Sequence, residues 1–399
     1  MSILKNIGEL ATVNPKSGEV EKISDAFLQW SGEDVVKIGL MDEIPNDTEV
    51  FDANGMLVTA GLVDAHTHPV FAGSRANEFY LRNSGVPYME IAKKGGGIRA
   101  SVRMLRESSD ATIRTQVQKN LDGFIAHGTT TIEGKSGYGL SVNDEIRSLK
   151  ILNEVAENHP LEVVPTFLGA HEVPDEYREN RNEYIRIVCE EMIPKVAEKE
   201  LAEYCDVFCE EGVFSVEESR KIFQAAKENG LKIRFHAEEF VANGGAQLAA
   251  EVGAHSADHL MAIEDSGIEA LKNGKVVPIA LPGTTFFLGK DSFAPVQKML
   301  KADLPVALAT DFNPGSSFTQ NLQLMMTIGC VQFGFSAEQA LKSVTYNAAK
   351  SLKREDKIGC ISAGFQADFV VWNVSNLDEL PYLFGTNHAK QVFKKGKLI

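Results

Sequence analysis

The chain has 399 residues, 44% of them hydrophobic, and 55 acidic residues against 40 basic ones give it a formal net charge of −15. This length allows one large domain and a smaller one, and the absence of a basic cluster argues against a nucleic-acid partner. The five cysteines are scattered and odd in number, no signal peptide is visible, and no apolar run approaches the ~20 residues of a membrane span, so we expect a cytoplasmic protein without a membrane partner.

The first sixty and the last forty residues are predicted to form a small sheet domain. Both segments contain short strand-like runs broken by Gly, Asn and Asp, at residues 27–32, 34–39, 49–61, 367–374 and 391–399. Because the two segments share this character, we predict one composite β-sandwich domain built from residues 1–60 and 357–399.

Between these segments, residues 61–356 alternate apolar runs with helical patterns. The apolar runs are residues 62–68, 129–134, 161–171, 205–212, 232–238, 256–260, 276–283 and 305–311. In one helical stretch, residues 215–230, Ser215 is a natural N-cap with Glu218 three residues later. Eight strand-like runs alternating with helices predict an α/β fold of the (β/α)8 TIM-like barrel type. An open doubly wound sheet is the alternative, but its nucleotide-binding glycine pattern is missing.

Five of these eight runs end on ionisable or metal-binding side chains. They are His66 with His68, His171, His236, His259 and Asp311, so five of the nine histidines lie at such ends. A single histidine at a strand end is more often structural. Because barrel enzymes carry their catalytic groups at the C-terminal ends of the strands, the convergence of five predicts an active site there.

Four of these side chains suit one divalent metal ion. His66 and His68 are two residues apart on a strand and therefore point to the same side. With His236 and Asp311 they make a three-histidine, one-carboxylate set that accepts Zn²⁺ or Fe²⁺. The alternative for Asp311 is a cap of the turn that residues 313–315 predict.

A carboxylate close to this predicted metal is expected to move protons. Glu239 lies three residues beyond His236 and is our candidate, whereas Glu238 is predicted only to start the following helix. His259 would lie beside the site and polarise a carbonyl oxygen. Lys135 would be a carbamylated bridge if two metals were bound. We favour a structural or substrate-side role for it, because no further ligand for a second metal is evident.

Several motifs in this chain resemble those of the imidazolonepropionase family, in the metal-dependent amidohydrolase superfamily. The resemblance runs through nearly the whole chain and includes "GLVDAHTHPVFAGSRANEFYLR", "IEGKSGYGL", "TFLGAHEVP", "FHAEEF", "SADHL" and "ATDFNPGSS". The H-x-H pattern marks only the superfamily, whereas "KSGYGL", "TFLGAH" and "NPGSS" are particular to this family.

The resemblance implies a hydrolase of histidine degradation. Water would open the ring of 4-imidazolone-5-propanoate to N-formimino-L-glutamate, through attack of a metal-activated hydroxide on the cyclic amide carbonyl. The implied metal ligands are His66, His68, His236 and Asp311, with Glu239, His259 and Asp311 as catalytic residues. The implied substrate contacts are Arg75, Tyr138, His171, Glu239, Asn313, Gly315 and Ser316. The family also implies a homodimer.

Two other functions are compatible with parts of this pattern. An aminohydrolase of the guanine or cytosine deaminase kind would keep the site, but an Arg at the mouth and the lack of an aromatic stacking pair argue against it. A non-catalytic relative would usually have lost metal ligands, and here all are present. For Arg75, the alternative to binding the substrate carboxylate is a surface ion pair with Glu78.

Overall fold

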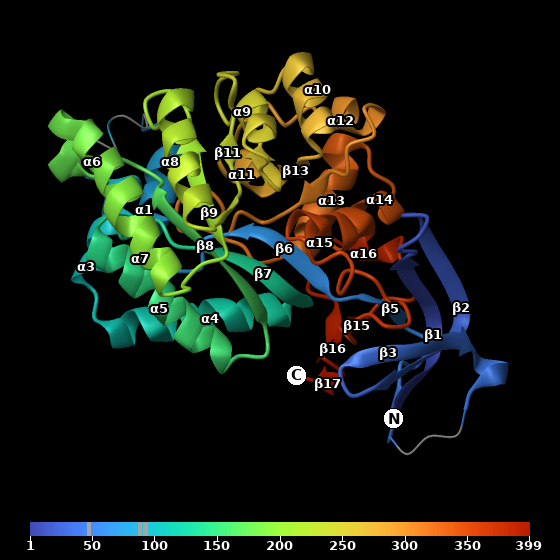
Figure 1. The fold of residues 1–399 in the computed structure, drawn as a ribbon. Helices are drawn as coiled ribbons and strands as arrows, with labels where there is room; N and C mark the ends of the chain where they lie inside the picture. Colours follow the sequence, from blue (N-terminus) through green and yellow to red (C-terminus); the bar gives the residue numbers. More distant parts are fainter. Residues whose placement is uncertain (46–48, 87–89, 91–94) are drawn as a thin grey trace.

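The computed structural model describes residues 1–45, 49–86, 90 and 95–399, and two sheets organise it (Figure 1). The strands are β1 Ser2–Val13, β2 Val20–Ser31, β3 Asp34–Leu40, β4 Glu49–Asp52, β5 Leu57–Ala60, β6 Leu62–Thr67, β7 Thr129–Lys135, β8 Glu162–Ala170, β9 Tyr204–Cys209, β10 Lys232–Ile233, β11 His236–Ala237, β12 Ser256–His259, β13 Val277–Ala280, β14 Ala307–Leu308, β15 Phe369–Trp372, β16 Ala389–Lys394 and β17 Lys397–Leu398. The α-helices are α1 Ala76–Asn83, α3 Ile98–Glu107, α4 Asp110–Ala126, α5 Val142–Glu157, α6 Arg181–Ile187, α7 Ile193–Glu198, α8 Val216–Glu228, α9 Gly245–Glu251, α10 Asp265–Gly274, α11 Pro282–Phe287, α12 Val296–Lys301, α13 Leu322–Phe333, α14 Ala337–Ser343, α15 Tyr346–Ser351 and α16 Glu379–Tyr382.

The larger sheet is a parallel barrel, as the sequence predicts. Its order is β6, β7, β8, β9, β11, β12, β13 and β14, and the short β10 pairs with β9 just before β11. Hydrogen bonds between the last and the first strand regions close the circle, because Asp311 N donates to His66 O and His68 N donates to Phe312 O. Each of the eight apolar runs contains one strand position of this barrel, so the predicted fold class is confirmed.

Helices cover the outside of the barrel (Figure 1), and α8 begins where the sequence predicts. At α8, Ser215 accepts a hydrogen bond from Glu218 N, while the Glu218 side chain accepts from Ser215 N, which is the predicted capping box. The strands between these helices are almost entirely buried on both faces, which is why they are near-continuous apolar runs rather than alternating ones.

The smaller sheet joins both chain ends, which lie side by side in Figure 1 as blue and red strands. Its order is β17, β16, β15, β5, β1, β2 and β3, with β4 beside β1. Two strands, β5 and β1, lie between β2 and β15 in this order. The ring centroids of Trp30 on β2 and Phe369 on β15 are nevertheless only 5.2 Å apart, which shows that the sheet curls. The strand β1 was not among the predicted elements. The predicted domain boundaries fall between β5 and β6 and after α15, and they stay a prediction.

No helix in the described part of the chain is both long enough and apolar enough to cross a membrane.

Candidate metal centre and active site

The structure brings the four predicted metal ligands together at the C-terminal end of the barrel. His66 is the last residue but one of β6, His68 follows that strand, His236 begins β11, and Asp311 follows β14. His68 Nε2 lies 3.4 Å from His66 Nε2 and 3.3 Å from Asp311 Oδ1, and the His66 and His236 ring centroids are 4.4 Å apart. Two overlapping groups have the spacing of a metal site, His66 with His68 and Asp311, and His66 with His236 and His259.

The chemistry of these donors fits a cation between them. His66 Nδ1 lies 2.7 Å from Asp258 Oδ2, and His236 Nδ1 lies 2.8 Å from Asp206 Oδ2. Because an ionised carboxylate only accepts hydrogen bonds, each Nδ1 carries a hydrogen, and the Nε2 of a neutral ring is then left with a lone pair for a metal. Burial also lowers the pKa of His66 well below its usual value, which keeps it neutral. Imidazole nitrogens and a carboxylate oxygen that face one another in a buried site, with the rings held by outer carboxylates, are a donor set that fits a metal cation.

Asp311 does not cap the turn that follows it. Its Oδ2 accepts a hydrogen bond of 2.6 Å from Thr284 Oγ1, while Oδ1 faces the histidines. The turn is formed by Asn313, whose Oδ1 accepts from the backbone N–H groups of Gly315 at 2.7 Å and Ser316 at 2.8 Å. The alternative role that the sequence allowed for Asp311 therefore belongs to Asn313.

The two neighbouring glutamates have different surroundings. Glu238 does not start the following helix as predicted, because α9 begins only at Gly245, but its Oε1 accepts from the backbone N–H groups of Gly244 and Ala246 at the start of that helix. Glu239 instead lies beside the cluster, with Oε2 3.6 Å from His259 Nδ1. Burial, followed by the nearby Asp311 charge, raises the pKa of Glu239 well above its usual value. Such a carboxyl group is suited to exchanging protons.

Tyr138 and His171 form one wall beside the histidines. The His171 ring stacks on that of His68 with centroids 5.2 Å apart, and Tyr138 lies 5.3 Å from His171 and 6.2 Å from His68 by ring centroids. His171 Nδ1 lies 2.9 Å from Gly137 O, which fixes the orientation of the ring. Both predicted substrate-contact residues thus lie at the mouth of the barrel next to the metal ligands.

Arg75 lies at the start of α1 and pairs with Glu78, as the alternative interpretation held. Its Nε and Nη2 donate to Glu78 Oε2 over 3.0 and 2.9 Å. The pair does not lie on the open surface, because the two side chains are only 11% and 9% exposed. Arg75 Nη1 faces Gly315, where an added Cβ would lie 2.2 Å from it. Arg75 therefore lies against the turn that follows Asp311.

A group of buried charges below the histidines was not predicted. Asp206 and Asp258 hold the Nδ1 atoms of two histidines, and Glu133 and Arg234 lie next to them with Lys135. A charged residue inside an otherwise apolar barrel strand signals a buried partner, and this signal is present at Asp206 and Asp258. Burial favours the neutral form of Lys135, but Asp206 and Glu133 outweigh it and raise its pKa. We favoured a structural or substrate-side role for Lys135, and an ammonium with these buried partners fits the structural one.

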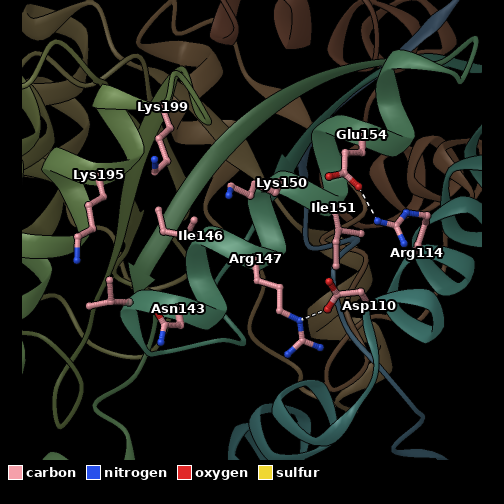
Figure 2. A pocket seen from close by; sticks show the side chains of 11 residues that line it. Asp110, Arg114, Asn143, Ile146, Arg147, Lys150, Ile151, Glu154, Lys195 and Lys199 are labelled. Carbon is pink, nitrogen blue, oxygen red and sulfur yellow. Dashed lines mark hydrogen bonds and ion pairs between the residues drawn. The ribbon is translucent and has the colours of Figure 1, made fainter.

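A surface cleft of about 410 Å³ lies elsewhere, among α4, α5 and α7. Figure 2 shows its side chains, including the ion pairs between Arg147 and Asp110 and between Arg114 and Glu154. None of the predicted site residues lines it, and it lies on the helical exterior rather than at strand ends. The candidate active site is therefore the histidine cluster at the barrel mouth.

Comparison with known proteins identifies close relatives along the whole chain. The model of the amidohydrolase family matches residues 57–399. The imidazolonepropionase of Alkaliphilus oremlandii is 44% identical over 99% of this chain and 97% of its own length. The imidazolonepropionase of Geobacillus kaustophilus is 44% identical over 95% of this chain and 92% of its own.

Solved structures show the same fold in more distant proteins. Escherichia coli guanine deaminase superposes with a TM-score of 0.76 at 18% identity, covering 100% of this chain and 99% of that one. The 5-methylcytosine deaminase of Klebsiella pneumoniae, with bound phosphonocytosine, gives a TM-score of 0.77 at 14% identity, covering 100% and 97%. At these identities the likeness is one of fold alone.

Proposed function

This chain belongs to the amidohydrolase family and, within it, to the imidazolonepropionases, and we propose that it uses the histidine cluster to open the ring of 4-imidazolone-5-propanoate with water. The product is N-formimino-L-glutamate, and the reaction is a step of histidine degradation. The observation that carries this assignment of the site is the convergence of His66, His68, His236 and Asp311 beside Glu239.

Members of this family depend on a metal, and among the residues that the structure describes, the histidine cluster has the spacing to hold one. We propose that His66, His68, His236 and Asp311 hold one divalent ion, Zn²⁺ or Fe²⁺, because neutral imidazoles and a carboxylate suit both. When bound, such an ion supplies hydroxide near neutral pH by lowering the pKa of water towards ~7 and polarises the amide carbonyl.

Glu239 is the proposed proton carrier. Its carboxylate takes a proton from the attacking water as the water oxygen bonds to the ring carbonyl carbon. The carboxyl group then donates that proton to the ring nitrogen, so that the C–N bond breaks and the nitrogen leaves as part of the formimino group. Asp311 faces the same space and is proposed to assist. The place of Glu239 beside His259 and its raised pKa support this role.

His259 is proposed to stabilise the negative charge that develops on the carbonyl oxygen. Burial lowers the pKa of His259 to about 3, so the ring is neutral and carries one N–H donor. Its ring centroid lies 5.2 Å from that of His236, within the cluster. The backbone of His259 has φ +77°, a left-handed conformation that only surrounding structure imposes on a non-glycine residue.

Arg75 is proposed to bind the propionate carboxylate. Glu78 accepts from Nε and Nη2 of the guanidinium. Nη1 is the remaining nitrogen, and it faces the turn of Asn313, Gly315 and Ser316. We propose that these three residues line the tail of the substrate while Tyr138 and His171 line its ring.

Assembly and location are further parts of the proposal. All five cysteines are free, which fits a reducing cytoplasm. A homodimer is the proposed assembly, and light scattering on the eluting protein tests it.

The substrate is tested by turnover of freshly made imidazolonepropionate against guanine and cytosine. Loss of the intact ring with formation of N-formimino-L-glutamate is the expected result. Release of ammonia from guanine or cytosine, without turnover of imidazolonepropionate, would contradict the proposed function and favour an aminohydrolase.

A further inference from the structure

Five charged side chains fill the barrel interior directly behind the metal-ligand cluster, and we call them the buried charge group. They are Glu133, Lys135, Asp206, Arg234 and Asp258, and each is 0% exposed. Three carboxylates face two cations, so the group carries one net negative charge. Side chains of this kind are almost never fully buried unless they are paired.

Lys135 lies at the centre of this group. Its Nζ is 2.6 Å from Glu133 Oε1, 2.7 Å from Asp206 Oδ2 and 4.0 Å from Asp258 Oδ2. Arg234 lies further from the same carboxylates, with Nε 3.3 Å from Glu133 Oε1 and Nη2 3.8 Å from Asp258 Oδ2. Arg234 instead donates to the backbone carbonyls of Ala65 and Ser351. Lys135 is thus the cation with the shortest contacts to these carboxylates.

Two of these carboxylates also orient proposed metal ligands. Asp206 Oδ2 accepts from both Lys135 Nζ and His236 Nδ1, and Asp206 Oδ1 accepts from the backbone N–H of His236 at 3.1 Å. Asp258 Oδ2 lies 2.7 Å from His66 Nδ1. A chain of contacts therefore runs from Lys135 through one carboxylate to His236 and through another toward His66.

We propose that Lys135 is a positioning residue for the metal centre, holding Asp206 and Asp258 so that His236 and His66 present Nε2 to one point. Without its ammonium the two carboxylates lose a shared cation, repel each other and release the orientation of the rings. Partners that orient ligand histidines in this way typically contribute a factor of 10 to 100 in metal affinity. This inference rests on the proposed metal site, and it assigns Lys135 no bond to the metal or to substrate.

Lys135→Met tests the inference through metal affinity, with Zn²⁺ as the probe and a chelator as competitor. We expect the Zn²⁺ dissociation constant to rise about 10- to 100-fold. The chain offers a matched control in Lys394, whose Nζ also bridges two carboxylates, Asp368 at 2.7 Å and Glu162 at 3.0 Å, with a side chain only 3% exposed. Lys394→Met removes an equivalent buried cation from the small sheet and should leave Zn²⁺ affinity unchanged.

A double variant keeps the test decisive if Lys135→Met fails to fold. Lys135→Met with Glu133→Gln retains one net negative charge but lacks the bridging ammonium. We expect it to fold and still to bind Zn²⁺ at least 10-fold more weakly than the parent. Parent-like affinity in either Lys135 variant, or an equal loss in Lys394→Met, would overturn the inference. A parent protein that binds neither Zn²⁺ nor Fe²⁺ would instead overturn the proposed metal site itself.

Discussion

Glu239 Oε2 lies 3.6 Å from His259 Nδ1, although Glu239 follows β11 and His259 ends the neighbouring strand β12. The contact brings the proposed proton carrier and the proposed oxyanion donor to one side of the metal-ligand cluster. Glu238, the adjacent residue, faces away from them and accepts from the N–H groups at the start of α9. Two adjacent residues thus have different roles: the Glu239 carboxylate lies in the candidate site, whereas the Glu238 carboxylate accepts hydrogen bonds at the start of α9.

Glu239→Gln should therefore abolish most turnover without removing the metal. The amide keeps the size of the side chain but cannot take the proton of water. We expect kcat to fall by about 10²- to 10⁴-fold, the usual contribution of a general acid–base group. Steady-state kinetics with metal content measured on the same samples checks this.

Glu238→Gln is the matched control for that variant. Its amide oxygen can still accept from Gly244 N and Ala246 N, so turnover should stay close to that of the parent. An inactive Glu238→Gln variant together with an active Glu239→Gln variant would show that Glu238, and not Glu239, carries the proton.

His236→Ala should purify folded with sharply reduced metal, because it removes one of the proposed ligands. His255 offers a control at the other end of the barrel, because it directly precedes β12. Its Nδ1 lies 3.1 Å from Tyr204 Oη. His255→Ala should keep its metal. Elemental analysis of both proteins decides the point, and full occupancy in His236→Ala would mean that the ligand set is wrong.

Arg75→Ala should act mainly on KM. The proposed contact is with the carboxylate tail, remote from the bond that breaks, so it is equally strong in the ground and transition states. A charge-assisted hydrogen bond contributes about 1.5–3 kcal/mol, which corresponds to roughly a 10- to 150-fold loss of kcat/KM. Arg75→Lys should recover only part, because a point charge cannot reproduce the guanidinium geometry.

Glu78→Gln separates the two roles that Arg75 can have. If Glu78 only orients Arg75 for substrate, this variant should raise KM less than Arg75→Ala does. An unchanged KM in Arg75→Ala would leave Arg75 as a structural partner of Glu78 and remove it from the substrate site.

Much of this site follows from local sequence pattern, because the ends of parallel barrel strands meet at one mouth. His66 lies in β6 and His68 directly follows that strand, and the side-chain alternation of extended chain is enough to predict that they point to the same side. The partners Asp206 and Asp258 could not be assigned in this way. Their role depends on which strands are neighbours and on the register between them, for example His236 opposite Asp258, and no single run of sequence encodes that register.

The pairing of Arg75 with Glu78 also combines a feature that local sequence predicts with one that depends on residues distant in sequence. Spacing along α1 made the ion pair predictable, since residues three apart on a helix are neighbours. The burial of the pair depends on the turn at Gly315, which is distant in sequence and approaches only in the folded chain.

The central claim, hydrolysis that depends on one metal at this cluster, is tested most directly by titrating the metal-free protein. The protein is stripped with a chelator and reloaded with Zn²⁺ or Fe²⁺ in steps, while the opening of imidazolonepropionate is followed at each step. We expect no turnover without metal and a rise that reaches its plateau at one ion per subunit. Full turnover by the stripped protein, or none by the fully loaded protein, would contradict the account.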